Sequence, residues 1–201
     1  MELEIPKQFE NLKHQIQFIN ISNNEQSLVD WRPVGLFANY DFELKDIRKT
    51  EIRNYYFKIN KISMNIYYLK KKDFFFSIGV EKALQRQLVE AVLDVVIEKL
   101  YDAYDFEVLI SYGSIDSTMF KTFKNDIEEI LSNFDDLNIV KTIRVPCSVC
   151  INIFPIIVKR NLIEKAPHYP VPVVCTHEDH DLLVYIDKEY KVRGMSPITF
   201  A

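Results

Sequence analysis

The sequence predicts an α+β protein, with an antiparallel sheet, two long C-terminal helices and a further small β-rich C-terminal module. Hydrophobic and polar residues alternate over 55–68, which is typical of strands. The hydrophobic spacing then changes to three and four residues over 82–104 and 117–134, which is typical of amphipathic helices. Beyond residue 135 the composition changes, because all three cysteines and most of the prolines follow it. We therefore expect two domains, 1–137 and 138–201.

The overall composition is that of a folded globular protein. Of the 201 residues, 48% are hydrophobic and 27% are charged, and the formal net charge is −4. No sustained basic block is present, so we expect no nucleic-acid partner. No apolar stretch is long enough for a transmembrane helix, and the first ten residues do not resemble a signal peptide. These features predict a cytoplasmic protein.

The first domain is expected to begin with a short helix that leads into a strand, within residues 6–21. Further strands are expected at 34–40, 55–59, 62–68 and 73–80. The last of these contains a nearly continuous apolar run from Phe74 to Phe76, which favours a central strand covered on both faces.

Two helices are expected after this sheet. Residues between Gly79 and Tyr104 include no glycine or proline, so one helix can run unbroken over about six turns. A short strand is expected at 106–112. Asp116 or Ser117 is a candidate N-cap for the second helix, which is expected over 117–134.

The strands expected at 66–69 and 73–80 are rich in aromatic residues, and a long helix follows them. That helix contains the segment 89–94 and ends near the acidic and aromatic residues of 101–105. In these features residues 28–134 resemble the longin-type module, particularly the amino-terminal domain of the signal recognition particle receptor alpha subunit and the small chains of clathrin-adaptor complexes. The helix at 120–134 would match the family's last helix.

Longin modules usually carry a helix between their second and third strands. Here the segment 43–54 is barely long enough to supply that helix, so a roadblock-type relative remains open. Longin and roadblock modules commonly bind small GTPases, pair with each other or dock peptides. They have no catalytic residues to carry over, so the resemblance implies a scaffold or adaptor in a trafficking or signalling assembly, as a homo- or heterodimer, and not an enzyme.

One face of the long helix is a candidate surface for binding a partner. Val89, Leu93 and Ile97 lie off the main apolar stripe of the long helix. They either form a second apolar face, which would suit a partner, or are buried beneath another element of this chain.

The second domain carries a cysteine and histidine pattern. Cys147 and Cys150 form a CxxC pair, and Cys175, His177 and His180 follow. Strands expected at 153–158, 171–175 and 182–186 could bring the two groups together, with a last hairpin through 187–193. Zinc takes about four sulfur and nitrogen ligands in a tetrahedron, so these five residues predict a structural zinc site. A metal-free core and a redox role for the CxxC pair are the alternatives, and Ile151 stands where a zinc knuckle often has glycine.

Two further functions use the same tail. A zinc-ribbon factor associated with nucleic acid would need a basic face there, for which the candidates are Lys159, Arg160, Lys165, Lys188, Lys191 and Arg193. A metal-dependent hydrolase would centre on His177 and His180, but the HExxH spacing is absent. The four isolated glycines exclude a P-loop or a dinucleotide-binding fold.

Overall fold

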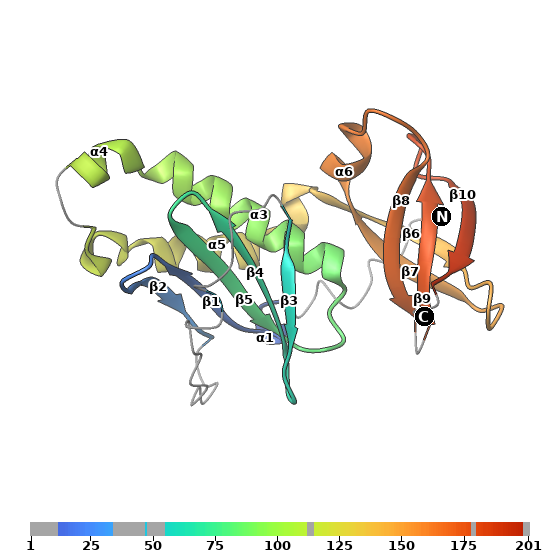
Figure 1. Ribbon diagram of the computed structural model, residues 1–201, viewed down its shortest axis with the longest axis horizontal. Coiled ribbons are helices and arrows are strands. Elements are labelled where there is room, and N and C mark those ends of the chain that lie inside the picture. Colours follow the sequence, from blue (N-terminus) through green and yellow to red (C-terminus); the bar gives the residue numbers. More distant parts are fainter. Residues whose placement is uncertain (1–11, 34–46, 48–54, 112–114, 178–179, 199–201) are drawn as a thin grey trace. The chain divides into compact units, whose positions relative to one another are not determined.

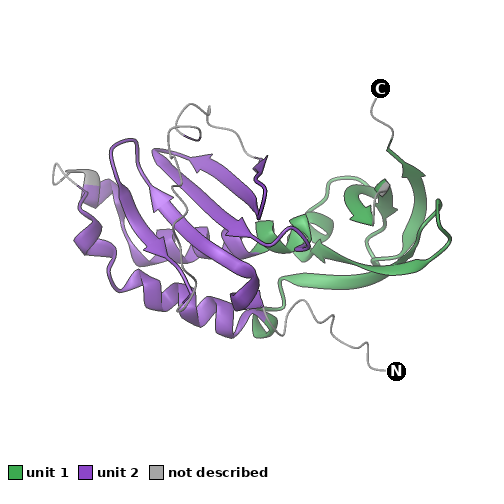
Figure 2. Ribbon diagram, turned by 90° about the horizontal axis from the view of Figure 1, so that it is seen from below, with its two compact units in different colours: residues 1–10, 85–91, 135–201 green, residues 11–84, 92–134 purple. Residues whose placement is uncertain are grey.

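The computed structural model describes residues 12–33, 47, 55–111, 115–177 and 180–198 (Figure 1). These residues form two compact units (Figure 2). The first unit, drawn in purple and labelled unit 2 in Figure 2, contains the described residues of 11–84 and 92–134. The second unit, drawn in green and labelled unit 1 there, contains 85–91 and the described residues of 135–201. The strand expected at 34–40 lies outside the described residues, as does all of the segment 43–54 except the helical Ile47.

The first unit contains a five-stranded antiparallel sheet. A short helix leads directly into its first strand, as the sequence predicts for 6–21. The elements are α1 (Leu12–Gln15), β1 (Ile16–Ser22), β2 (Ser27–Trp31), β3 (Phe57–Asn60), β4 (Asn65–Lys71) and β5 (Phe74–Val80). Their order across the sheet is β2-β1-β5-β4-β3. The aromatic strand β5 is therefore central, as its apolar run predicts, and all seven of its residues are buried.

The centre of this sheet depends on a close approach at Gly79. Gly79 pairs with Phe18 on one side and with Ile66 on the other. A Cβ atom placed on Gly79 would overlap the ring of Phe18 and touch the sulfur of Met64. Glycine at this position lets the Phe18 ring approach the backbone of β5 closely.

The helices of this unit lie on one face of the sheet (Figure 2). They are α3 (Arg86–Ala103) from Val92 onward, α4 (Phe106–Ser111), the 3-10 turn η1 (Ser117–Phe120) and α5 (Phe123–Ser132). The 3-10 turn η2 (Phe134–Leu137) begins at the last residue of this unit. Tyr101 of α3 contacts Phe76 of β5, with ring centroids 6.3 Å apart. The indole Nε1 of Trp31 on β2 donates to Glu128 of α5 at 2.9 Å.

The expectation of two long C-terminal helices is wrong. The 18-residue α3 is followed by α4 of 6 residues and α5 of 10 residues, and the described residues form ten strands in three antiparallel sheets. The segment expected as one helix over 117–134 divides because Asp116, a correctly predicted N-cap, starts the 3-10 turn η1 by accepting from Thr118 N at 2.6 Å. A new helix then begins at Phe123.

Two further expectations are corrected: the strand at 106–112 and the partner surface on the long helix. Residues 106–112 were expected to form a strand, but Phe106–Ser111 is the helix α4. The Asp105 carboxylate explains this, because it accepts from the backbone N–H groups of Glu107 and Val108 and so caps the first turn. The face of the long helix that was a candidate partner surface is buried, because Val89, Leu93 and Ile97 are at most 3% exposed.

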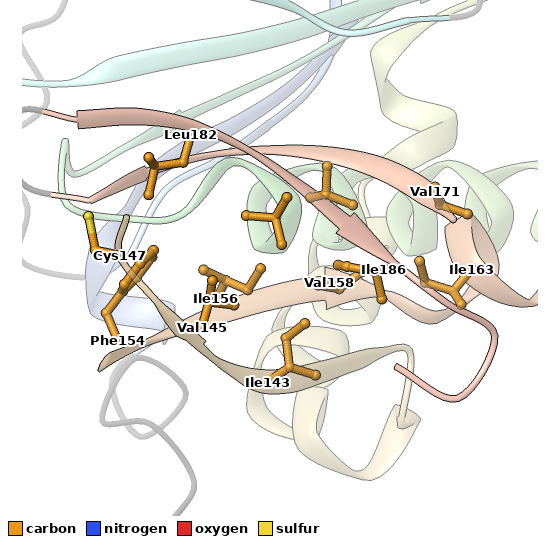
Figure 3. Packing of buried hydrophobic residues seen from close by; sticks show 12 residues of the cluster. Ile143, Val145, Cys147, Phe154, Ile156, Val158, Ile163, Val171, Leu182 and Ile186 are labelled. Atoms are coloured by element: carbon orange, nitrogen blue, oxygen red, sulfur yellow. The ribbon is translucent and has the colours of Figure 1, made fainter. Parts of the chain in front are cut away.

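The second unit contains a two-stranded sheet and a three-stranded sheet. Its elements are β6 (Val140–Pro146), β7 (Ile153–Lys159), α6 (Arg160–Glu164), β8 (Val171–His177), β9 (His180–Ile186) and β10 (Val192–Pro197). The pairings are β6-β7 and β10-β9-β8, all antiparallel. Strand β6 and helix α6 were not expected from the sequence. The two sheets share one core of mostly aliphatic side chains, with Cys147 at one end beside Phe154 (Figure 3).

The first turns of α3 belong to this second unit and bind its strand β7. The side-chain amide of Gln85 donates to Pro155 O at 3.0 Å and accepts from Ile157 N at 2.8 Å. The buried carboxylate of Glu90 lies 3.1 Å from Lys159 Nζ and 2.6 Å from Arg86 Nε. The charge on Glu90 is therefore compensated by two cations.

The last hairpin, which the sequence predicts through 187–193, is closed by Asp187. Its carboxylate accepts from Glu189 N at 2.8 Å, from Lys191 N at 2.9 Å and from the guanidinium of Arg193. These hydrogen bonds, with the one from Lys191 the largest contribution, lower the pKa of Asp187 below its ordinary value.

Candidate metal centre

The β6–β7 hairpin positions the first two thiols. Cys147 N donates to Asn152 O at 2.7 Å, and Ile151 N donates back to Cys147 O at 3.0 Å. The chain therefore turns tightly between Cys147 and Asn152, which places Cys150 on the same turn as Cys147. Val149 N donates to Cys147 Sγ at 3.4 Å, so a backbone dipole points at this sulfur and would stabilise its thiolate.

The turn requires a left-handed residue after Cys150. Ile151 has a φ of 66° and is 85% exposed. A β-branched residue rarely adopts this conformation, which costs on the order of 1–2 kcal/mol compared with glycine. Ile151 thus has the backbone conformation that a glycine would favour at this point of a zinc knuckle, although the side chain is not glycine.

The β8–β9 hairpin supplies an imidazole. His177 is the last residue of β8 and pairs with His180, the first residue of β9. Its ring is stacked on the ring of Phe154 of β7, with centroids 4.0 Å apart and planes 9° apart. Because Phe154 is buried, this stacking fixes the orientation of the imidazole.

These two hairpins bring three potential ligands together. One ligand atom each from Cys147, Cys150 and His177 lies within 4.8 Å of the other two, so this cluster could hold a metal ion. In a tetrahedral zinc site, bonds of about 2.0–2.3 Å place the ligand atoms about 3.5–3.8 Å apart. The present separation is therefore within about 1 Å of that geometry.

Cys175 lies beside this cluster, but its sulfur is not one of the ligand atoms that lie within 4.8 Å of one another. Burial, together with smaller contributions from the nearby Cys147 and Asp181, raises the pKa of the Cys175 thiol to about 11. None of the three cysteines forms a disulfide. The side chain of His180 lies outside the described residues.

The structure thus unites three of the five ligands predicted from the sequence. Two features of the site were missed. The stacking of Phe154 on His177 has no sequence signal, because it depends on how two separate hairpins meet. The left-handed turn at Ile151 had a signal in the CxxC spacing, but an isoleucine argued against it.

Carboxylates lie beside most of the candidate residues for the basic face that a nucleic-acid factor would need. Four of its six candidate residues pair with carboxylates: Lys159 with Glu90, Arg160 with Glu164, Lys191 with Glu189 and Arg193 with Asp187. Their charges are therefore largely balanced within the chain.

Comparison with known proteins identifies no relative: no protein-family model matches the chain, and no curated protein is significantly similar to it. In the part of the chain that the structure describes, the helices are too short or too polar to cross a lipid bilayer.

Proposed function

We propose that this chain is a non-catalytic binding protein whose second unit is stabilised by a structural zinc ion. The observation that carries the proposal is the meeting of Cys147, Cys150 and His177 from two separate hairpins within 4.8 Å. Thiolates with imidazole are the typical donor set of structural zinc, whereas hard cations prefer oxygen ligands.

The surroundings of the cluster support a structural role for the metal. Cys147 is 2% exposed and belongs to the core of the second unit. The hydrogen bond from Val149 N and the stacking of Phe154 hold two of the ligands before any ion binds. An ion at this place would join the two hairpins where no covalent link joins them.

Zinc content tests the metal directly. Purified wild-type protein should contain one zinc per chain by elemental analysis, and Cys147→Ser should lose it. Val174→Ser is a matched control, because Val174 lies in β8 with its side chain 51% exposed. A wild-type protein that folds without any metal would refute the zinc proposal.

The binding function follows from the resemblance of residues 28–134 to longin and roadblock modules. We propose a small GTPase, or another longin or roadblock chain, as the partner. The exposed apolar side chains of Val149, Ile151 and Ile153 also support a binding role, since soluble proteins seldom expose such residues in a group.

The partner class is tested by pull-down with the full chain as bait. A panel of small GTPases is loaded with GDP or a non-hydrolysable GTP analogue, and longin and roadblock chains are included. We expect one class to bind. Retention of none of them, in either nucleotide state, would remove the partner proposal and leave the zinc proposal standing.

A further inference from the structure

The fourth metal ligand follows from the geometry of strand β8. This inference rests on the proposed zinc site. Cys147, Cys150 and His177 supply three ligands, whereas structural zinc has four protein ligands. A site with only three would keep one position for water, as catalytic zinc does.

Alternation along β8 places Cys175 on the same face as His177. From Val171 to His177, the side chains alternate between buried or half-buried and exposed positions. Val171, Val173, Cys175 and His177 face inward, and the three residues between them face outward. Cys175 therefore lies one step along the same face from a ligand already in the cluster.

The register and packing give the same placement. Cys175 pairs with Leu182 of β9, which is fully buried. Cys175 and Cys150 both pack against the core cluster that contains Cys147. All three cysteines therefore border the same core.

A nearby carboxylate is a poorer candidate. Asp181 pairs with Thr176, which faces outward from β8. Its Oδ1 accepts from Thr176 Oγ1 at 2.7 Å, so the carboxylate is already engaged on that side. Thiolate is also the preferred donor for zinc beside two other thiolates.

We propose that Cys175 is the fourth ligand, so that the ion is held by three thiolates and one imidazole. Binding Zn²⁺ releases up to three thiol protons to solvent and leaves no coordination position for water. Closing the site requires the Cys175 side chain to move towards Cys147, by a change of rotamer or a small shift of β8. The centre is then structural and not hydrolytic.

X-ray absorption spectroscopy at the zinc edge tests this on the wild-type protein. Three sulfur neighbours and one nitrogen neighbour are expected. Two sulfurs with two lighter neighbours would overturn the inference while the zinc proposal stands. Absence of bound zinc would instead refute the zinc proposal itself, so the two failures are distinguishable.

Cobalt substitution identifies the residue. The sulfur-to-cobalt charge-transfer band of the Co²⁺ protein should lose about a third of its intensity in Cys175→Ser, because one of three thiolates is removed. Affinity for Co²⁺ should fall more than tenfold. Val174→Ser, on the outward face of β8, and His180→Ala should leave both readouts unchanged.

The results for His180→Ala and Cys175→Ser distinguish the two candidates for the fourth ligand. If His180→Ala lowers the affinity and Cys175→Ser leaves the charge-transfer band unchanged, His180 is the ligand and the inference is overturned. If Cys175→Ser does not fold, the sulfur count of the wild-type zinc protein decides.

Discussion

The cores of the two units differ in the kinds of side chain that they bury. The first packs large aromatic rings among its aliphatic side chains, and Phe74, Phe75, Phe76, Phe120 and Phe123 are all at most 1% exposed. The second has a core of twelve buried residues, which are mainly valine, leucine and isoleucine with a single phenylalanine. A small core of this kind contributes less hydrophobic stabilisation, and such modules commonly depend on metals or other cross-links. The comparison teaches where a metal should matter for stability and where it should not.

Metal removal should give the largest difference between the units. A strong chelator should increase hydrogen exchange throughout β6–β9 but leave β4 and β5 protected. The loss of opening free energy in the second unit should be on the order of 5 kcal/mol or more, because metal binding contributes directly to folding. Hydrogen exchange read by mass spectrometry measures both units in one sample.

Added zinc is the control for this experiment and should restore protection. Equal exchange with and without the chelator would show that the second unit does not depend on a metal.

The reverse difference is expected from Gly79→Ala. The added Cβ would overlap the ring of Phe18 and contact Met64, so the first unit should lose about 2–3 kcal/mol of stability. Denaturant unfolding followed by the near-ultraviolet signal of Trp31 reports on this unit. Gly194→Ala is the matched control, because its Cβ would meet only Tyr185 at an ordinary 3.7 Å. Similar losses for both variants would contradict the close approach at Gly79.

A smaller change, of opposite sign, is expected from Ile151→Gly in the second unit. Glycine relieves the left-handed strain and loses little burial, so the metal-loaded protein should gain about 0.5–1 kcal/mol. Thermal unfolding with saturating zinc measures this gain. Ile153→Gly is the control: Ile153 is also exposed, but it lies in strand β7, where glycine should destabilise. Destabilisation by both variants would argue against strain at Ile151.

The smallest effect concerns the pH dependence of the β9–β10 hairpin. The pKa of Asp187 is lower in the folded protein than its ordinary value, because backbone N–H groups and Arg193 stabilise the carboxylate. The contribution of the Asp187 carboxylate to the free energy of unfolding is therefore complete above the pKa of about 3.9 in the unfolded chain. It is lost as the pH falls through the lower pKa in the folded protein. The melting-temperature difference between wild type and Asp187→Asn should shrink from pH 6 to about pH 3. A difference that stays constant over this range would exclude the mechanism.

Sequence reasoning predicted strands well where the apolar residues were regularly spaced or formed a continuous run. The alternation in β3 and β4 and the apolar run of β5 correspond to observed strands, and the apolar stripe over 82–104 corresponds to α3. It failed for 106–112 and 117–134, where local capping by Asp105 and Asp116 decided the backbone. Hydrophobic period alone does not report such caps. Strand β2 was missed because its five residues, which include Asp30 as the fourth, lack a strong alternation.

The candidate metal site could be predicted only in part. The CxxC spacing identified Cys147 and Cys150, and the strand that carries Cys175 was expected. The approach of His177 to the two thiols depends on the β8–β9 register and on the ring of Phe154. Both are tertiary features, and a spacing rule along one chain does not contain them.

The hydrogen bonds of Gln85 have a consequence for self-association. One strand edge of β7 pairs with β6, and the Gln85 amide occupies Pro155 O and Ile157 N. An intruding β-strand from another molecule would have to displace this side chain before it could form a ladder with those two backbone groups. Gln85 thus protects the edge of β7 against edge-to-edge aggregation, which matters because this strand is rich in isoleucine and valine.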